Sequence, residues 1–350
     1  MLTNSVIAML RHAEAVATPR QLPRLKFAER YRLWAPDDPR SERMALEMDL
    51  DHHYSPSRWS HRMGPTEVIQ AHIQALKEGS EASKREVQDH EIGISYGISD
   101  KEKLDIFGAK TLPGEAPIFV YIHGGYWTDL SRDISSFMAS TFCKAGAMVV
   151  AIGYNLAPQV GMTEIISQVK KAISYVLNLA KRRGSSGVYL CGHSAGGHLA
   201  AMMLTINWME ETMVSPGLIK GAVLVSGIYD LMPLLSTYVN GPLKMTKEET
   251  LLSSPNSHLR ALAELSSSRR IIVAFAAHDP PEFQRQSVEF NTSLIQNNLH
   301  STMLLVPDCD HFNVIENLEQ EGYILTKETL KLMGLNIDII MDKMRQADIS

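Results

Sequence analysis

The sequence predicts an α/β fold in which a mostly parallel central sheet has helices on both faces and an antiparallel start. Short apolar runs recur with helical stretches between them, at residues 118–122, 147–152, 188–191, 222–225, 271–276 and 303–306. That alternation is typical of parallel strands joined by crossover helices. Residues 92–96 and 104–107 instead alternate side chains as half-buried strands do, and residues 97–103 between them suit a hairpin loop. The first two strands are therefore expected to be antiparallel.

Helices are indicated by apolar side chains that recur every three or four residues. Residues 65–76 carry Val68, Ile69, Ile73 and Leu76 at that spacing, and residues 165–179 and 194–206 show the same period. A shorter helical pattern starts at Glu42. We therefore expect a helical lead-in at residues 46–90, before the sheet. Prolines interrupt any long helix in residues 1–45, which are interpreted as an N-terminal extension that could be mobile.

Composition sets the class of protein. The chain has 350 residues and 45% hydrophobic side chains, enough for one large α/β domain over residues 46–350. Basic and acidic residues number 34 and 39, the longest basic run is residues 181–183, and no nucleic-acid partner is indicated. The apolar runs are far shorter than a membrane-spanning helix.

Three scattered cysteines, Cys143, Cys191 and Cys309, form neither a disulfide framework nor a zinc motif. This usage favours a cytoplasmic protein, and a nuclear location is equally compatible. Residues 1–26 contain four basic side chains against one acidic, so a mitochondrial transit peptide is the minor alternative. Whether the chain is a monomer or a homodimer is left open by the sequence.

The sequence Gly192-His193-Ser194-Ala195-Gly196 lies between a predicted strand and a predicted helix. Strand, Gly-x-Ser-x-Gly and helix in that order form the context of a nucleophile elbow. The turn is so tight that only glycine fits at its flanks, and it exposes the serine hydroxyl at the edge of the sheet. Ser194 is therefore the candidate nucleophile, although the motif alone is also compatible with an ordinary strand–helix turn.

A nucleophilic serine needs a base and an orienting acid, which follow it along the chain in hydrolases of this type. His311 lies just after the last predicted strand and is the last histidine of the sequence. Asp279 lies at the end of the preceding strand, so we expect a catalytic triad of Ser194, Asp279 and His311. Glu282 and Asp230 are the alternative acids.

The loop after residues 118–122 reads His123-Gly124-Gly125-Tyr126-Trp127. Two glycines allow backbone N–H groups to approach a substrate closely, and His-Gly-Gly motifs supply an oxyanion donor. Gly124, Gly125 and Ala195 are the expected oxyanion hole. Tyr126 and Trp127 could stack on an aromatic substrate, or they could pack beneath the loop.

Three stretches together resemble the kynurenine formamidase (arylformamidase) family of α/β-hydrolases. They are residues 123–127, residues 192–198, and Asp279-Pro280-Pro281-Glu282-Phe283 followed by Arg285-Gln286-Ser287. The lead-in Tyr54-Ser55-Pro56-Ser57-Arg58-Trp59 is similar to that family too, and the resemblance covers roughly residues 45–330. Residues 154–159 read Tyr-Asn-Leu-Ala-Pro-Gln, which departs from the Tyr-Arg-Leu-Ala-Pro-Glu of hormone-sensitive-lipase-like esterases.

The resemblance implies hydrolysis of the small molecule N-formyl-L-kynurenine to L-kynurenine and formate, a step of tryptophan catabolism in the kynurenine pathway. It implies no cofactor. A metal-dependent type of formamidase exists, but the closely spaced His and Asp ligands of that type do not occur in this sequence. The alternative function is a carboxylesterase of the hormone-sensitive-lipase-like type that acts on small acyl esters. A non-catalytic hydrolase fold that serves as a binding module is a third reading.

Overall fold

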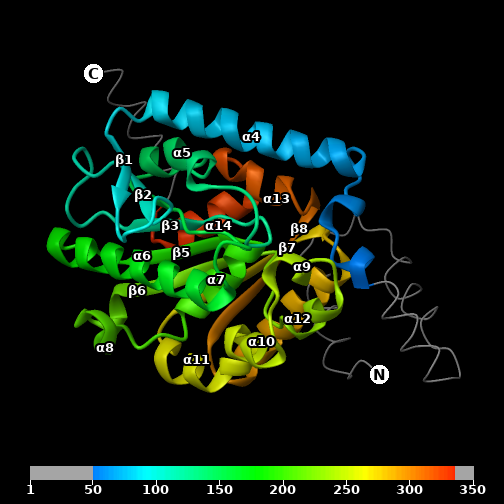
Figure 1. Ribbon diagram of the computed structural model, residues 1–350. Coiled ribbons are helices and arrows are strands. Elements are labelled where there is room, and N and C mark those ends of the chain that lie inside the picture. The colour runs from blue at the N-terminus through cyan, green and yellow to red at the C-terminus, as the bar shows by residue number, and fades with distance from the viewer. Residues whose placement is uncertain (1–49, 336–350) are drawn as a thin grey trace, which may run out of the picture. The chain divides into compact units, whose positions relative to one another are not determined.

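Eight strands pair into one sheet in the order β1-β2-β4-β3-β5-β6-β7-β8 (Figure 1). The structure, a computed structural model, describes residues 50–335. β1 pairs with β2 and β2 with β4 in antiparallel fashion, and every other neighbouring pair is parallel. This confirms the predicted fold class, including its antiparallel start. The strands are β1 (His90–Ser95), β2 (Lys103–Phe107), β3 (Ile118–Ile122), β4 (Met148–Ile152), β5 (Val188–His193), β6 (Ile219–Val225), β7 (Arg270–His278) and β8 (His300–Asp310).

Helices cover both faces of the sheet, with α4, α5, α13 and α14 on one side and α6, α7 and α12 on the other (Figure 1). The α-helices are α4 (Pro65–Glu86), α5 (Ala139–Lys144), α6 (Met162–Arg183), α7 (Ala195–Met203), α8 (Trp208–Thr212), α9 (Asn240–Leu243), α10 (Lys247–Ser253), α11 (Leu259–Ser266), α12 (Pro281–Gln296), α13 (Asn313–Glu316) and α14 (Ile324–Leu332). Short 3-10 turns lie at Pro56–Arg58, Arg132–Ile134, Pro216–Leu218, Met232–Ser236, Pro255–His258 and Asn317–Glu319.

The centre of the sheet is its most apolar part. All five residues of β3 and all five of β4 are buried, and both strands are covered from either face. β3 pairs in register with β4 and β5, so that Val120 faces Val150 on one side and Leu190 on the other. The continuous apolar runs in the sequence arise because a central parallel strand has no face exposed to water. The loops after β3 and β5 therefore meet at the same edge of the sheet.

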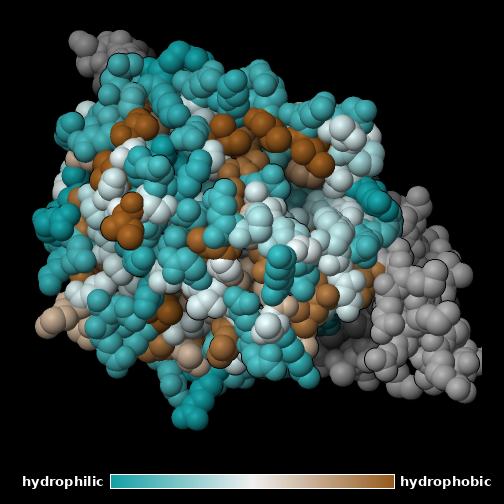
Figure 2. Space-filling view, in the orientation of Figure 1, coloured by the Kyte–Doolittle hydropathy of each residue, from teal (hydrophilic) through white to brown (hydrophobic). Residues whose placement is uncertain are grey.

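Helix α4 is longer than the spacing predicts, and it buries a different face. Val68 and Leu76 are buried as expected, but Ile69 and Ile73 are each 43% exposed. Figure 2 shows apolar atoms gathered on the outer side of this helix. The buried face continues instead through the small residues Gly79, Ser80 and Ser83. These small residues allow the helix to approach the chain at Phe137 closely, since a Cβ at residue 79 would lie 2.8 Å from the Phe137 Cβ.

The expectations for residues 1–45, the helical pattern from Glu42 and the transit-peptide alternative fall on residues 1–49, outside the described part of the chain. From residue 52 onward, the described chain folds as one compact unit that contains the whole sheet. Between residues 50 and 335, no helix combines the length and the apolar character needed to cross a membrane.

Candidate active site

Ser194 occupies a strained turn between β5 and α7. Its φ of 55° lies in the left-handed region, which non-glycine residues adopt rarely and mostly where function requires it. The flanking glycines are required by contact: a Cβ at residue 192 would lie 2.0 Å from the Gly196 carbonyl oxygen, and one at residue 196 would lie 2.0 Å from that of Ile122. The Ser194 N–H donates to the Val225 carbonyl at 2.8 Å. The turn thus has the geometry of the nucleophile elbow that the motif predicts.

The predicted base and acid are in direct contact. His311 Nδ1 lies 2.6 Å from Asp279 Oδ1, and both side chains are almost fully buried. Because a carboxylate accepts hydrogen bonds, Nδ1 is the donor to Asp279, and Nε2 is the ring nitrogen left to act as an acceptor. His193, the neighbour of Ser194, donates from Nε2 to the His311 carbonyl at 2.8 Å. This bond brings the loop with the base against the nucleophile elbow.

The Asp279 carboxylate is held by three donors. Oδ1 accepts from His311, while Oδ2 accepts from Ser226 Oγ at 2.6 Å and from the Ala276 N–H at 2.7 Å. The alternative acids make other contacts: Glu282 pairs with Arg285 at 2.7 Å, and Asp230 Oδ1 accepts from the Met232 N–H. Of the three candidate acids, Asp279 is the one that contacts His311 within the described residues.

The loop after β3 lies against the elbow. A Cβ at residue 124 would lie 3.2 Å from the Ser194 Cβ and 2.8 Å from the His193 carbonyl, so a side chain there would collide with the nucleophile. Gly125 has a φ of +94° and is followed by two more residues with positive φ, Tyr126 and Trp127. Gly124, Gly125 and Ala195, which begins α7, stay the predicted oxyanion donors.

The Trp127 side chain is fully buried, and its Nε1 donates to His198 Nδ1 at 3.2 Å. The expectation that Trp127 stacks on a substrate does not fit this geometry, since no face of the ring is accessible. Packing beneath the loop, the other alternative, describes it instead. Tyr126 is partly exposed, and its ring lies edge-on to those of Tyr238 and Phe283 at 6.5 and 6.2 Å.

The rings of Tyr126, Tyr238 and Phe283 form an aromatic wall. Phe283 extends it to the predicted base, because its ring lies edge-on to His311 with 4.6 Å between centroids. Tyr238, at 52% exposure, and Phe283 were missed as site residues by the sequence reasoning. An aromatic residue two positions after Asp-Pro-Pro was visible in the sequence, but its distance to His311 was not. Phe283 is itself buried, at 1% exposure, so Tyr126 and Tyr238 are the rings of this wall that a flat, apolar substrate group can reach.

Three further histidines near the elbow are neutral. Burial lowers the pKa of His123 to about 4 and that of His198 to about 4, and it holds the pKa of His193 well below its ordinary value. His198 donates from Nε2 to the Ser253 carbonyl, while His123 stacks on Tyr154 at 4.2 Å. These contacts make His193 and His198 packing and hydrogen-bonding residues.

The lead-in before α4 contacts the site from outside the sheet. Tyr54 is fully buried; its hydroxyl donates to Glu282 Oε2 at 2.9 Å and accepts from Gln286 Nε2 at 2.8 Å. The Tyr54 carbonyl accepts from the Tyr126 hydroxyl at 2.6 Å. Two of the stretches that carry the family resemblance, around residues 54 and 282, are therefore joined in space next to the oxyanion loop.

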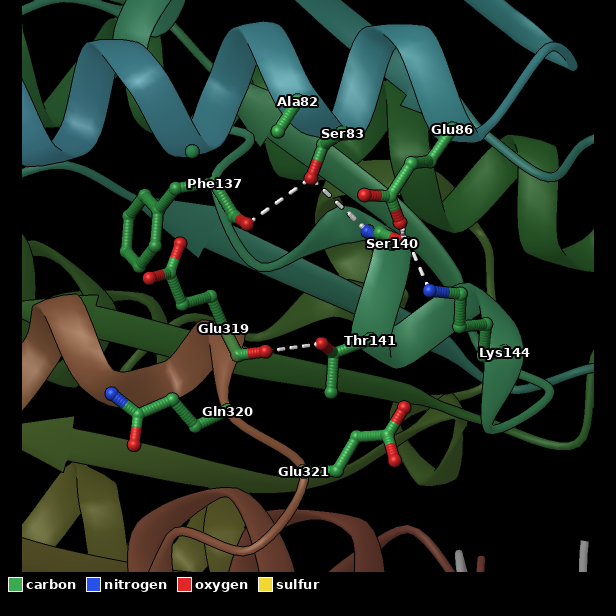
Figure 3. A pocket seen from close by; sticks show the side chains of 11 residues that line it. Ala82, Ser83, Glu86, Phe137, Ser140, Thr141, Lys144, Glu319, Gln320 and Glu321 are labelled. Carbon is green, nitrogen blue, oxygen red and sulfur yellow. Dashed lines mark hydrogen bonds and ion pairs between the residues drawn. The ribbon is translucent and has the colours of Figure 1, made fainter. Parts of the chain in front are cut away.

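A separate groove of about 410 Å³ lies between α4, α5 and the loop after residue 318 (Figure 3). Its polar side chains bond to one another: Ser140 and Lys144 both reach Glu86, and Thr141 donates to the Glu319 carbonyl. It contains none of the residues around the elbow and is not the candidate active site. Among residues 50–335, no group of three or more His, Cys, Asp or Glu side chains is arranged to hold a metal ion.

The fold is that of the α/β-hydrolase class, and the site has the arrangement expected of a serine hydrolase. Solved structures of that class are similar to this chain. A putative thioesterase from Silicibacter sp. TM1040 has a TM-score of 0.61 at 26% identity and covers 79% of this chain and 97% of its own. A Pyrobaculum calidifontis esterase has a TM-score of 0.57 at 17% identity, over 86% of this chain and all of its own. The BD-FAE family model matches residues 104–284.

The curated relatives are more specific. The kynurenine formamidases of Danio rerio and Salmo salar are 47% and 46% identical to this chain, each over 82% of it and 96% of their own length. The kynurenine formamidase of Drosophila melanogaster is 26% identical over 77% of this chain. The chain belongs to the kynurenine formamidase family, as its motifs predict.

Proposed function

We propose that this protein hydrolyses N-formyl-L-kynurenine to L-kynurenine and formate, with Ser194 as nucleophile, His311 as base and Asp279 as orienting acid. It is an arylformamidase, a hydrolase that acts on a linear amide bond. The observation that carries the assignment of roles is the 2.6 Å bond between His311 and Asp279 beside a strained, glycine-flanked serine. Family membership supports the substrate.

The first half of the reaction forms a formyl-serine. His311 Nε2 takes the Ser194 proton as the hydroxyl oxygen attacks the formyl carbon. Negative charge develops on the formyl oxygen, and the N–H groups of Gly124, Gly125 and Ala195 are proposed to bind it. His311 then returns the proton to the nitrogen of the aryl amine, the C–N bond breaks, and kynurenine leaves.

The second half regenerates the enzyme. Water attacks the formyl ester after giving a proton to His311, the tetrahedral intermediate collapses, and formate and free Ser194 result. Asp279 keeps the imidazole in the required tautomer throughout and stabilises its charged form. The cycle is complete with these residues and water, and it needs no cofactor.

The substrate's aromatic amine is proposed to lie against Tyr126 and Tyr238, while the buried Phe283 ring packs against Tyr126. Tyr126 replaces Trp127 as the ring proposed to contact the substrate, because it is partly exposed. The formyl hydrogen requires little space beside Gly124, where the loop and Ser194 are in contact. A flat leaving group and a minimal acyl group both suit this arrangement.

A comparison of substrates tests the proposal. Purified protein is assayed with N-formylkynurenine and with p-nitrophenyl esters of increasing acyl length. We expect kcat/KM to be highest for N-formylkynurenine and to fall along the ester series. Efficiency that rises with acyl length would favour the alternative carboxylesterase function, and the formamidase assignment would be withdrawn.

Location and assembly are also proposals. Few, scattered cysteines favour the cytoplasm, with nuclear presence compatible and mitochondrial targeting by the N-terminal extension as the minor alternative. A homodimer is proposed alongside a monomer, and light scattering on the purified protein distinguishes them. The boundary between an extension at residues 1–45 and a single domain at residues 46–350 stays a prediction, which limited proteolysis can test.

A further inference from the structure

The residue before the candidate base, Asp310, has a carboxylate with no exposed surface and several hydrogen-bond donors around it. Oδ1 accepts from the N–H groups of Phe312 at 2.9 Å and Asn313 at 3.0 Å. Oδ2 accepts from Ser60 Oγ at 2.6 Å. The carboxylate therefore closes the turn at residues 310–313, in which His311 lies.

Arg62 binds this carboxylate with two nitrogens. Its Nε lies 2.8 Å from Oδ2 and its Nη2 lies 3.1 Å from Oδ1, the two-pronged geometry that only arginine provides. Burial by itself would raise the pKa of Asp310, but the hydrogen bonds from Arg62 and Ser60 outweigh it and hold that pKa well below the usual range. Asp310 is therefore ionised whenever the protein is folded near neutral pH.

The guanidinium is fully committed to protein partners. Its Nη1 lies 3.4 Å from Glu316 Oε2, and Glu316 Oε1 in turn lies 2.7 Å from His72 Nδ1. Within the described residues, the side-chain hydrogen bonds and ion pairs of Arg62 involve Asp310 and Glu316, and none involves the proposed triad. A direct role in substrate binding is not supported, because Nε and Nη2 already pair with Asp310 and Nη1 pairs with Glu316.

His311 needs such support because the sheet does not supply it. β8 ends at Asp310, and its pairing with β7 is irregular just before that residue. Beyond the strand, the ring direction depends on the Asp279 bond to Nδ1, on the turn, and on the His193 bond to the His311 carbonyl. A misplacement of a reacting group by about 1 Å can cost about 100-fold in rate.

We propose that Arg62 is a positioning residue for this reaction: through Asp310 it fixes the turn that aims His311 at Ser194. The inference rests on the proposed triad. It gives the lead-in before α4 a function in catalysis, although that segment lies outside the sheet and contains no reacting group. Ser60 contributes one further donor to the same carboxylate.

The test compares R62M and R62K with the wild type. Arg58→Met is the matched control, because Arg58 is an exposed arginine of the same segment that forms no ion pair among the described residues. For each protein, kcat and KM are measured with N-formylkynurenine. The rate constant of Ser194 phosphonylation by a fluorophosphonate and the number of sites labelled at completion are measured alongside. D310N and the double variant R62M/D310N complete a cycle.

We expect R62M to lower kcat by about 100-fold with KM changed less than about three-fold. The phosphonylation rate constant should fall in parallel, while the number of sites labelled at completion stays that of the wild type. R62K should recover part of the loss, since it keeps the charge without the fork. R62M should add nothing to D310N, and R58M should behave as the wild type.

A folded R62M with wild-type kcat and phosphonylation rate would overturn the proposal. So would a loss explained by fewer labelled sites that each react at the wild-type rate, because that pattern indicates stability alone. If R62M does not fold, S60A decides: slower phosphonylation with unchanged site number supports the proposal, and a wild-type rate refutes it. Failure of the triad itself would appear separately, as a wild-type protein that is not labelled or an H311A variant that keeps full activity.

Discussion

Replacement of Asp279 by Asn tests the proposed acid most sharply. An amide has one accepting oxygen where the carboxylate has two. If that oxygen keeps the bonds from Ser226 Oγ and the Ala276 N–H, now 2.6 and 2.7 Å long, the NH2 group must face His311. His311 Nδ1 would then have to accept, and its proton would move to Nε2, the atom that should take the proton of Ser194.

The loss expected from the wrong tautomer is about 10⁴-fold in kcat, or about 5 kcal/mol of transition-state stabilisation. The matched controls are E282Q and D230N. E282Q alters the bonds to Tyr54 and Arg285, and D230N alters the hydrogen bond from the Met232 N–H. Neither variant should lose more than about ten-fold in kcat, because neither carboxylate contacts His311 among the described residues.

The assay is kynurenine release by the three purified variants, with thermal unfolding of each as a control for folding. The ranking D279N far below E282Q and D230N is the expected result. A folded D279N within ten-fold of the wild type would refute the assignment of the acid, and so would D230N as the inactive variant.

Four further results are expected. W127A should lower the free energy of unfolding by about 3–5 kcal/mol, because it empties a fully buried site, and calorimetry that shows unchanged stability would contradict this. G124A should lower kcat by at least about 100-fold with the fold retained, because a methyl group would press on Ser194; a variant with normal kcat would argue against the oxyanion loop. Burial sets the pKa of His198 at about 4 against 6.5 for an ordinary histidine, so the unfolded chain binds the extra proton first. The contribution of His198 to the free energy of unfolding should therefore be fully present above pH 6.5 and fall by about 3 kcal/mol towards pH 4. Denaturant titrations of H198Q should show a flatter pH dependence than those of the wild type. On one aryl amine, efficiency should fall steeply from formyl to acetyl to butyryl, as chromatography of the released amine can show.

Local patterns were sufficient for the sheet and for the elbow. The run at residues 118–122 is β3 to the residue, because a strand buried on both faces must be apolar throughout. The order of Ser194, Asp279 and His311 along the chain predicted which loops meet, since parallel strands place their carboxyl ends at one edge. The Asp279–His311 contact follows from that topology.

The remaining features depend on contacts between distant segments. Arg62 and Asp310 are 248 positions apart, and nothing in either local sequence indicates the pair. Trp127 is buried because the loop after β3 turns its ring towards His198, which depends on three successive residues with positive φ. Helical spacing predicted α4 but not its buried face: Ile69 and Ile73 share that spacing and are each 43% exposed, whereas Gly79 and Ser83 lie against Phe137.

The central claim is that Ser194 is the nucleophile in the hydrolysis of N-formylkynurenine. Its most direct test is the rate of kynurenine release by the wild type and by S194A, with both proteins shown to be folded by thermal unfolding. We expect the wild type to release kynurenine and formate in equal amounts and S194A to be slower by several orders of magnitude. A folded S194A with near-wild-type turnover would contradict the mechanism.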